Sequence, residues 1–295
     1  MLHNVAEGYP VRNFVSNGAG GRLHRAVAYL FVFTSICLMS GCGVATKYKI
    51  IDEPGKIEIE DPVEKLQVGE RFTYKAEWLG MDVGTATLSV EEVTTQNGRK
   101  VYHILATAES AALISKIYKV KDYISTYLDV EFLYPVRFEK EQREGGYRSD
   151  EYTDFDQERG MAFYFSRLNH SKKEYAIPEK VQDPLSCLYY FRLQDIDVGK
   201  SVFANVNADE KNYLVEAKVH NKGFIKIEGV GEWEAFMVEP LPWFQGKITR
   251  RAKATIWFSA DEKRIPLLVT TSGIPFVGSV KITLQRIENL DTKGQ

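Results

Sequence analysis

Cysteine is scarce in this chain, and its scarcity excludes several classes of protein. Only three cysteines occur in 295 residues, which is too few for a disulfide framework, and no two of them form a C-x-x-C pair. The patterns H-E-x-x-H and G-x-S-x-G do not occur either, so zincin, zinc-ribbon and α/β-hydrolase chemistry have no support. We therefore expect no metal, no cofactor and no enzymatic activity.

No charge of one sign dominates the sequence. It has 38 Lys and Arg against 40 Asp and Glu, a formal net charge of -2 at pH 7. A nucleic-acid surface would need a clear excess of Lys and Arg, so we expect no nucleic-acid partner. Aromatic residues are plentiful instead, with 16 Tyr, 16 Phe and 4 Trp. They alternate with polar residues in short runs, which is typical of β-strands with one buried face.

The N-terminal region lacks an apolar run of about 20 residues, the length that a transmembrane helix needs. The stretch Ala26–Leu38 is uncharged over only 13 residues and follows the basic residues Arg22 and Arg25. A short apolar core behind a positive flank is typical of a secretory signal peptide. An uncleaved anchor over residues 26–42 is the alternative.

Met39, Ser40, Gly41 and Cys42 follow the apolar core. They resemble the bacterial lipobox, in which an aliphatic residue and two small ones precede a cysteine, although Met39 stands where leucine is usual. The resemblance implies cleavage before Cys42 and acylation, palmitate included, of its sulfur and its new amino group. The alternative is an ordinary cysteine near a normal cleavage site. Two or three acyl chains hold a protein on a membrane effectively permanently.

The residue after Cys42 bears on the compartment. It is Gly43 rather than aspartate, which by analogy with Gram-negative sorting favours the inner leaflet of the outer membrane, facing the periplasm. We divide the chain into a lipoprotein signal peptide (1–41), an acylated tether (42–64), a single β-rich domain (65–288) and a polar tail (289–295).

The fate of the signal peptide decides the cysteine chemistry. If Cys37 leaves with the signal and Cys42 is acylated, Cys187 alone remains in the folded part, and no intramolecular disulfide can form. A lone cysteine in an oxidising compartment is usually buried and inert. A nucleophilic cysteine would need a histidine partner, and no histidine of the mature chain lies in a recognisable signature.

Alternating apolar positions recur along 65–288. Two strands, Phe72–Trp78 and Ala86–Val90, flank a turn at Gly80–Gly84, and Asn97-Gly98 is a strong signal for a second hairpin. Similar runs give about a dozen strands or more, without the alternating helices of a parallel sheet. So many antiparallel strands must close into a barrel or split into packed sheets.

One segment, at about 183–194, departs from the β pattern. Asp183 can cap a helix there, and Pro184 suits its first position, where a missing N–H is harmless. Apolar residues lie on both sides of this helix, so we expect it to be buried against or inside the sheet. The predicted fold class is all-β, a large antiparallel meander forming a curved or barrel-like sheet with one short buried helix.

An ordered series of motifs along residues 65 to 288 resembles the bacterial family called domain of unknown function 3108. The family is exported and β-rich and has no agreed activity, so the resemblance implies the fold and the export but no catalytic residue. The matching motifs are Gly69-Glu70 with Tyr74, Gly84-Thr85-Ala86, Pro135 before Arg137-Phe138, Arg143–Arg148, Asp183–Ser186, and Trp257 with Ser259, Asp261, Arg264 and Pro266.

Two groups of residues are candidate sites. Asp150, Glu151, Asp154 and Asp156 could serve as calcium ligands or paired acids only if they converged, and spacing along a strand favours a solvated strand face instead. The loop predicted at 239–247 carries Trp243 and Phe244. These two could plug the core, touch the membrane or stack on a sugar, and we treat them as possible ligand or partner contacts.

Two functional hypotheses follow. The first is a non-enzymatic cell-envelope lipoprotein that binds an apolar or amphipathic, lipid-like ligand, or that acts as an assembly or scaffold factor for an envelope protein. It rests on the predicted lipid anchor and the barrel-sized strand count. The alternative is a glycan-binding or glycan-active periplasmic protein, which as an enzyme would need two carboxylates about 5 to 10 Å apart in a cleft.

Overall fold

The structure is a computed structural model that describes residues 66–249, 253–274 and 278–289. The predicted signal peptide, lipobox and tether, Cys42 included, lie outside the described residues. Strands occupy the chain from Arg71 to Glu288.

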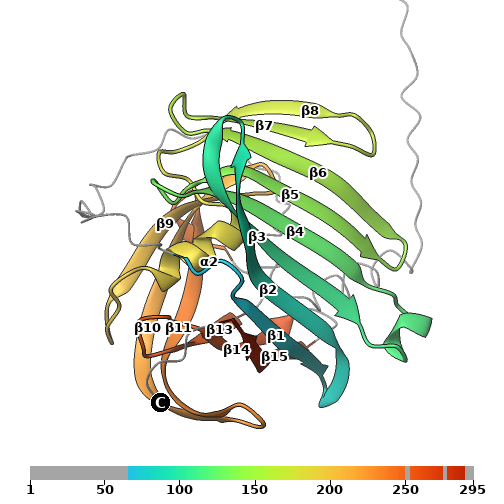
Figure 1. Cartoon of the computed structure of the whole chain (residues 1–295), viewed down its shortest axis with the longest axis vertical. Helices are drawn as coiled ribbons and strands as arrows, with labels where there is room; N and C mark the ends of the chain where they lie inside the picture. Colours follow the sequence, from blue (N-terminus) through green and yellow to red (C-terminus); the bar gives the residue numbers. More distant parts are fainter. Residues whose placement is uncertain (1–65, 250–252, 275–277, 290–295) are drawn as a thin grey trace, which may run out of the picture.

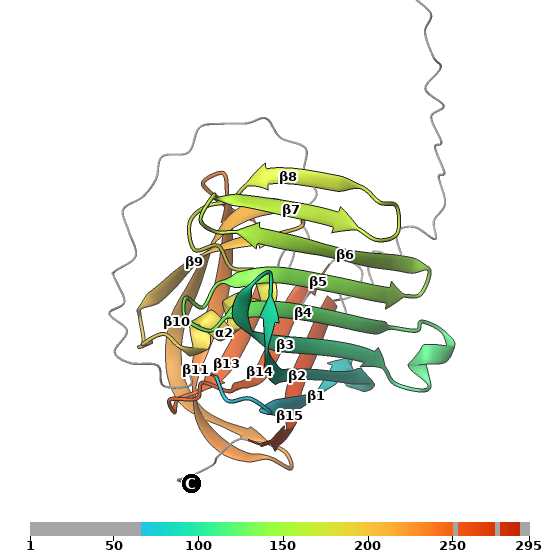
Figure 2. The same cartoon turned by 45° about the horizontal axis from the view of Figure 1, so that its top comes forward.

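A single antiparallel sheet of 15 strands makes up nearly all of the described fold (Figures 1 and 2). Neighbours along the chain are neighbours in the sheet from β8 back to β1; β15 then pairs with β1, and the order continues through β14, β13, β11 and β10 to β9. The predicted all-β meander is therefore confirmed. The strands are β1 Arg71–Trp78, β2 Met81–Gln96, β3 Arg99–Ser110, β4 Lys121–Asp129, β5 Pro135–Glu144, β6 Tyr147–Asp156, β7 Met161–Ser166, β8 Lys172–Ala176, β9 Ser201–Ala208, β10 Lys211–Ile227, β11 Gly231–Phe244, β12 Lys247–Ile248, β13 Lys253–Ser259, β14 Pro266–Ile274 and β15 Gly278–Glu288.

The turn between β2 and β3 is a two-residue turn, as predicted. Asn97 and Gly98 have φ angles of 50° and 78°, and a two-residue turn with two positive φ angles matches the twist of the strands that it joins. The first hairpin turn is shorter than predicted, because β2 already begins at Met81 and Gly84 lies inside that strand. The connection between β3 and β4 contains a short 3-10 helix, η2 Ile114–Lys116.

The sheet curves until its two edge strands, β8 and β9, face each other, but no ladder joins them. Side chains close the seam instead: Tyr175 Oη donates to Asn207 Oδ1 at 3.0 Å, and Asn212 Nδ2 donates to the Ala176 carbonyl at 2.8 Å. The segment before the helix adds a single parallel bridge between Gln182 and Val206. The result is a barrel-like sheet whose last gap is closed without a continuous strand pairing.

Helix α2 Pro184–Arg192 lies inside the curve of the sheet (Figure 1). The Asp183 side chain caps it, accepting hydrogen bonds from the Leu185 and Ser186 backbone at 2.8 Å each, and Pro184 takes the predicted first position. Leu185, Tyr189 and Phe191 join the inward-facing apolar residues of β1–β4 and of β11 and β13–β15 in one core cluster. The expectation of a helix buried on both sides is confirmed, and this part of the interior is filled by the helix.

A buried ion pair fastens the end of the helix to the start of the sheet. Arg192 Nη1 and Nη2 donate to the two carboxylate oxygens of Glu70 at 2.5 and 3.0 Å. Only 5% of the Arg192 side chain and 2% of the Glu70 side chain are exposed. The guanidinium also lies 4.9 Å from the ring centroid of Tyr189. Either charge would be strongly destabilising if it were buried without the other. The two-point contact between Arg192 and Glu70 compensates both charges.

Candidate functional site

Strands β4 to β8 carry polar residues on both faces, which makes this half of the sheet the place to look for a site. Cross-strand pairs assign each side chain to a face, since opposed residues point the same way. Phe138 opposite Thr126 and Lys140 opposite Ile124 point inward with those buried partners. Arg137, one residue earlier, points outward with Tyr127.

The inward face holds a half-buried lysine between two carboxylates. Lys140 Nζ lies 2.8 Å from Glu151 Oε1 and 3.2 Å from Asp209 Oδ1, and Tyr164 Oη donates to Glu151 Oε2 at 2.9 Å. Burial lowers the pKa of Lys140, but Asp209 and Glu151 outweigh it and hold that pKa above its ordinary value. Asp209 lies in the turn after β9 and Lys140 on β5, so the Lys140–Asp209 pair joins the two halves of the sheet across its open seam.

A second inward group pairs two acids. Asp122 and Glu144 are 2% and 1% exposed, and burial, followed by the neighbouring Asp122, raises the pKa of Glu144 to about 9. Gln142 donates to Glu144 Oε1 at 3.1 Å, while Glu144 Oε2 has no donor among the described residues. We infer that Glu144 carries a proton, which lets it donate a hydrogen bond to the Asp122 carboxylate. Burial of both side chains and the raised pKa of Glu144 thus indicate a protonated Glu144 beside Asp122.

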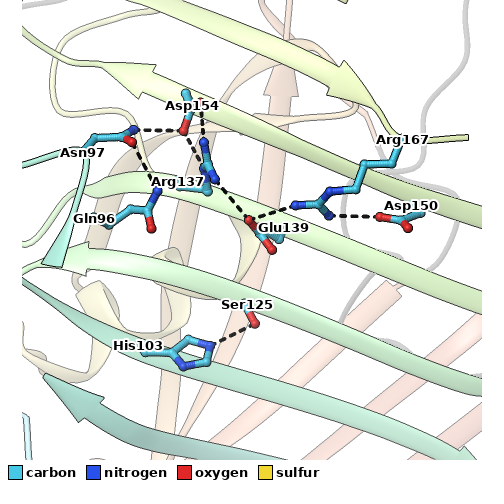
Figure 3. Close-up of polar contacts among 9 residues, drawn as sticks. All are labelled: Gln96, Asn97, His103, Ser125, Arg137, Glu139, Asp150, Asp154 and Arg167. Atoms are coloured by element: carbon cyan, nitrogen blue, oxygen red, sulfur yellow. Dashed lines mark hydrogen bonds and ion pairs between the residues drawn. The ribbon is translucent and has the colours of Figure 1, made fainter. Parts of the chain in front are cut away.

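The outward face carries an arginine network (Figure 3). Arg137 binds both carboxylate oxygens of Asp154, at 2.6 and 2.7 Å. Arg167 donates to Asp150 at 2.9 Å and to Glu139 at 3.1 Å. Two-point contacts between guanidinium and carboxylate fix the orientation of the arginine as well as its position.

Aromatic rings lie directly beside this network. The guanidinium carbons of Arg137 and Arg167 both lie over the Tyr152 ring, 4.3 and 5.0 Å from its centroid. Tyr152 contacts Phe165 on the next strand, with ring centroids 5.4 Å apart. Tyr127 stands opposite Arg137 on β4. We call Tyr127, Arg137, Tyr152, Phe165 and Arg167 the outer platform; all five are half-buried or exposed.

The predicted acidic cluster does not converge. Asp150 and Asp154 lie on the outward face with their arginines, and Glu151 lies inward with Lys140. Asp156 accepts the Arg159 backbone N–H at 2.9 Å. The preferred strand-face interpretation therefore holds, except that the carboxylates are ion-paired rather than freely solvated. No group of three or more His, Cys, Asp or Glu that could hold a metal occurs among the described residues.

Trp243 and Phe244 do not lie in a loop, which corrects the prediction for 239–247. β11 continues to Phe244 through two prolines. The prolines are tolerated because β13 pairs with β11 only as far as Val238, and β12 pairs with Trp243 and Phe244 beyond them. Phe244 packs on Tyr213, with ring centroids 5.3 Å apart. The indole N–H of Trp243 points to Glu216 Oε2 at 3.3 Å. A role for these two side chains in binding stays a prediction.

Cys187 packs beside Val206, Tyr213 and Val215. Burial raises the pKa of its thiol to about 12, so the thiolate needed for nucleophilic chemistry is scarcely populated at neutral pH.

Among the described helices, none is long and apolar enough to cross a membrane.

Sequence alone did not indicate Arg137, Tyr152 and Arg167 as a group. Alternation along β6 places Asp150, Tyr152 and Asp154 on one face, and that signal was available. The arginines come from other parts of the meander, and only the strand register brings them to this face.

The fold defines a class of protein, a β-barrel-like antiparallel meander with a helix inside. The chain belongs to the family described as protein of unknown function (DUF3108), whose model matches residues 73–285. No curated protein sequence matches the chain.

Solved structures share the architecture at low sequence identity. A β-barrel-like protein of the domain of unknown function DUF1849 from Brucella abortus aligns with a TM-score of 0.53 and 9% identity, over 76% of this chain and 99% of that one. A candidate exported protein with a YmcC-like fold from Bacteroides fragilis gives 0.33 and 9%, over 75% and 96%. A candidate lipoprotein from Parabacteroides distasonis gives 0.28 and 11%, over 78% and 100%. Only the first TM-score exceeds 0.5, and it bears on the fold alone.

Proposed function

We propose that this chain is a lipid-anchored cell-envelope protein that works by binding rather than by catalysis, and that its outer platform binds a protein partner. The observation that carries the proposal is the position of Tyr152 under two guanidiniums that carboxylates hold in place. Tyrosine and arginine are enriched among the residues that dominate binding energy at interfaces. Side chains that are already ordered lose less entropy when a partner binds.

The interior supports this choice over a carrier of apolar ligands. A lipid-binding barrel offers its ligand an apolar cavity. Here α2 places Leu185, Tyr189 and Phe191 among the inward-facing apolar residues, and the inward face of β5 and β6 carries the Lys140–Glu151 ion pair. Ionised groups at this position do not favour an apolar guest.

The acid pair inside the sheet supports binding rather than glycan hydrolysis. Retaining glycosidases hold two carboxyls about 5 Å apart and inverting ones hold them farther apart, with the sugar or a water between them. Asp122 and Glu144 are almost fully buried, so a sugar does not reach them in this arrangement. On the outward face, Arg137 and Arg167 neutralise Asp154 and Asp150.

The proposed location rests on the sequence. Acylated Cys42 would hold the domain at a membrane, and Gly43 favours the outer membrane, with the domain in the periplasm. The segment 42–64 would then be the spacer between the bilayer and the sheet.

Site-specific photo-crosslinking in the bacterial envelope tests the outer platform. A benzophenone amino acid at Phe165 should give one discrete, light-dependent protein adduct. The same probe at Thr270, an outward and half-exposed position on β14, is the matched control and should give none. Tyr152→Ala should weaken binding of the partner identified in the adduct at least tenfold in a purified assay. Equal adducts at both positions, or unchanged affinity in Tyr152→Ala, would contradict the proposal, and an adduct with a glycan strand would favour the alternative function.

Native mass spectrometry separates binding at the surface from carriage in the interior. The mature chain with Cys42→Ser should have the mass of the polypeptide alone. A lipid retained at one molecule per chain would contradict the choice of the platform and favour the carrier.

A further inference from the structure

Two neighbouring connections expose large apolar side chains at one end of the meander. Leu79 and Met81 in and after the β1–β2 turn are 71% and 51% exposed, and Leu113 and Ile117 between β3 and β4 are 72% and 88% exposed. A hydrogen bond of 2.9 Å from the Ala111 N–H to the Val83 carbonyl joins the two connections. Both lie at the right of Figure 2, where the β3–β4 connection is the green loop.

The β1–β2 turn holds a leucine in an unfavourable backbone conformation. Leu79 has a φ angle of 51°, a conformation that glycine, asparagine and aspartate adopt readily and that is unfavourable for leucine. A turn chosen for its backbone alone would carry one of those residues here. Leucine at this position therefore indicates that the exposed side chain itself has a use.

Two lysines lie within the second connection. Lys116 and Lys119 are exposed, and neither makes an ion pair within the part of the chain that the structure describes. Asp82 is the acid nearest in sequence to Met81. Its Oδ1 accepts a hydrogen bond of 3.2 Å from the Gly84 N–H. Exposed apolar side chains beside free lysines suit the boundary between the acyl chains and the headgroups of an anionic bilayer.

We propose that this apolar end, made of Leu79, Met81, Leu113, Lys116, Ile117 and Lys119, docks on an anionic lipid surface. The inference rests on the proposed membrane location and adds an orientation to it: this end of the sheet faces the bilayer and the outer platform stays free at its side. The four apolar side chains stand at the tips of connections rather than on a flat face, which fits insertion between headgroups better than a protein interface.

The segment between Cys42 and the domain allows this orientation. A coil of 24 residues, the number from 42 to 65, would have an end-to-end distance of roughly 27 Å. Strand β1, which separates the domain's first residues from the β1–β2 turn, has 8 residues and thus a length of about 26 Å. The anchor can therefore hold the apolar end at the bilayer, and its proximity raises the effective concentration of the lipid surface for this otherwise weak contact.

Vesicle binding of the unacylated mature chain tests the proposal. With Cys42→Ser in every sample, co-sedimentation is measured on vesicles of phosphatidylglycerol and phosphatidylethanolamine in a 3:7 ratio. Leu113→Ser with Ile117→Ser should lower the partition coefficient at least tenfold, and Lys116→Gln with Lys119→Gln should lower it and flatten its salt dependence. Phe224→Ser is the matched control, because Phe224 is also 72% exposed but lies on β10, which does not pair with β1 to β4.

Three results of the vesicle experiment would contradict the proposed lipid contact. No binding of the parent chain to these vesicles, equal binding by the Leu113→Ser, Ile117→Ser variant, or an equal loss in Phe224→Ser would overturn the proposal. Unfolding midpoints of all variants are measured in parallel, so that a misfolded sample is recognised. Because no sample carries an acyl chain, the result is independent of whether Cys42 is acylated, and an absent partner at the outer platform would leave it unchanged.

Discussion

Glu70 and Arg192 form a two-point ion pair inside the fold although 122 residues separate them in the chain. The pair joins the residue before β1 to the last residue of α2, and so it fixes the helix against the first strand of the sheet. Arg192 Nε adds a hydrogen bond of 3.2 Å to the Lys263 carbonyl, which lies in the turn between β13 and β14. One guanidinium thus connects three distant parts of the chain.

Removal of this guanidinium should be strongly destabilising. Arg192→Met leaves Glu70 buried without a partner, so we expect the free energy of unfolding to fall by about 3–5 kcal/mol. Urea denaturation followed by circular dichroism measures the change. The double variant Glu70→Gln, Arg192→Met should recover part of the loss, because it removes the uncompensated charge.

The exposed pair Arg71–Glu91 provides the matched control. Its side chains are 36% and 30% exposed, so Arg71→Gln should change the free energy of unfolding by less than about 1 kcal/mol. Equal effects of Arg192→Met and Arg71→Gln would show that the buried pair does not have the structural role assigned to it.

The acid pair predicts how stability depends on pH. The pKa of Glu144 is about 9 in the folded chain against an ordinary value of 4.5, so between these values the folded state holds a proton that the unfolded state has released. Stability contributed by this proton is complete below pH 4.5 and is lost as pH rises toward 9. Glu144→Gln should flatten this decline and be more stable than the parent chain at pH 8.

Denaturation curves at intervals from pH 5 to pH 9 check this prediction. Glu141→Gln, on the outward face of the same strand, is the matched control and should retain the parent slope. A parent chain whose stability rises over this interval would be inconsistent with a proton shared by Asp122 and Glu144.

Two glycine substitutions should differ in their effect on stability. Gly98 has a φ angle of 78° and open space around its missing Cβ, so Gly98→Ala should destabilise the chain by about 1–2 kcal/mol through backbone strain alone. Gly223, on β10, has equally open surroundings without a positive φ, so Gly223→Ala should be neutral or stabilise by up to about 1 kcal/mol. Thermal unfolding of both variants compares them directly, and a Gly98→Ala variant as stable as the parent chain would refute the assignment of the Asn97-Gly98 turn.

The pattern of alternating residues predicted most of the fold because most strands bury one face. β8 escaped prediction, since the run Lys172–Ala176 is mostly exposed at the sheet edge and has no apolar side to reveal it. Alternation does not show that β10 is one long strand, because a bulge at His220 interrupts it. The helix was predictable from Asp183 and Pro184, whose capping chemistry is local.

The candidate site was less predictable, for a physical reason. Tyr152 lies under Arg137 and Arg167 only because β5, β6 and β7 pair in one particular register. A shift of one residue would turn each of these side chains to the other face. Likewise, Glu70 and Arg192 carry no local signal of their pairing, because tertiary packing alone brings them together.

Acylation of Cys42 is the measurement that tests the proposed function most directly. Cells are grown with labelled palmitate, and the chain is recovered from the membrane fraction. The proposal predicts that the parent chain and Cys187→Ser incorporate the label and sediment with membranes, and that Cys42→Ser does neither. Equal labelling and membrane association of Cys42→Ser would contradict a lipid anchor at this residue.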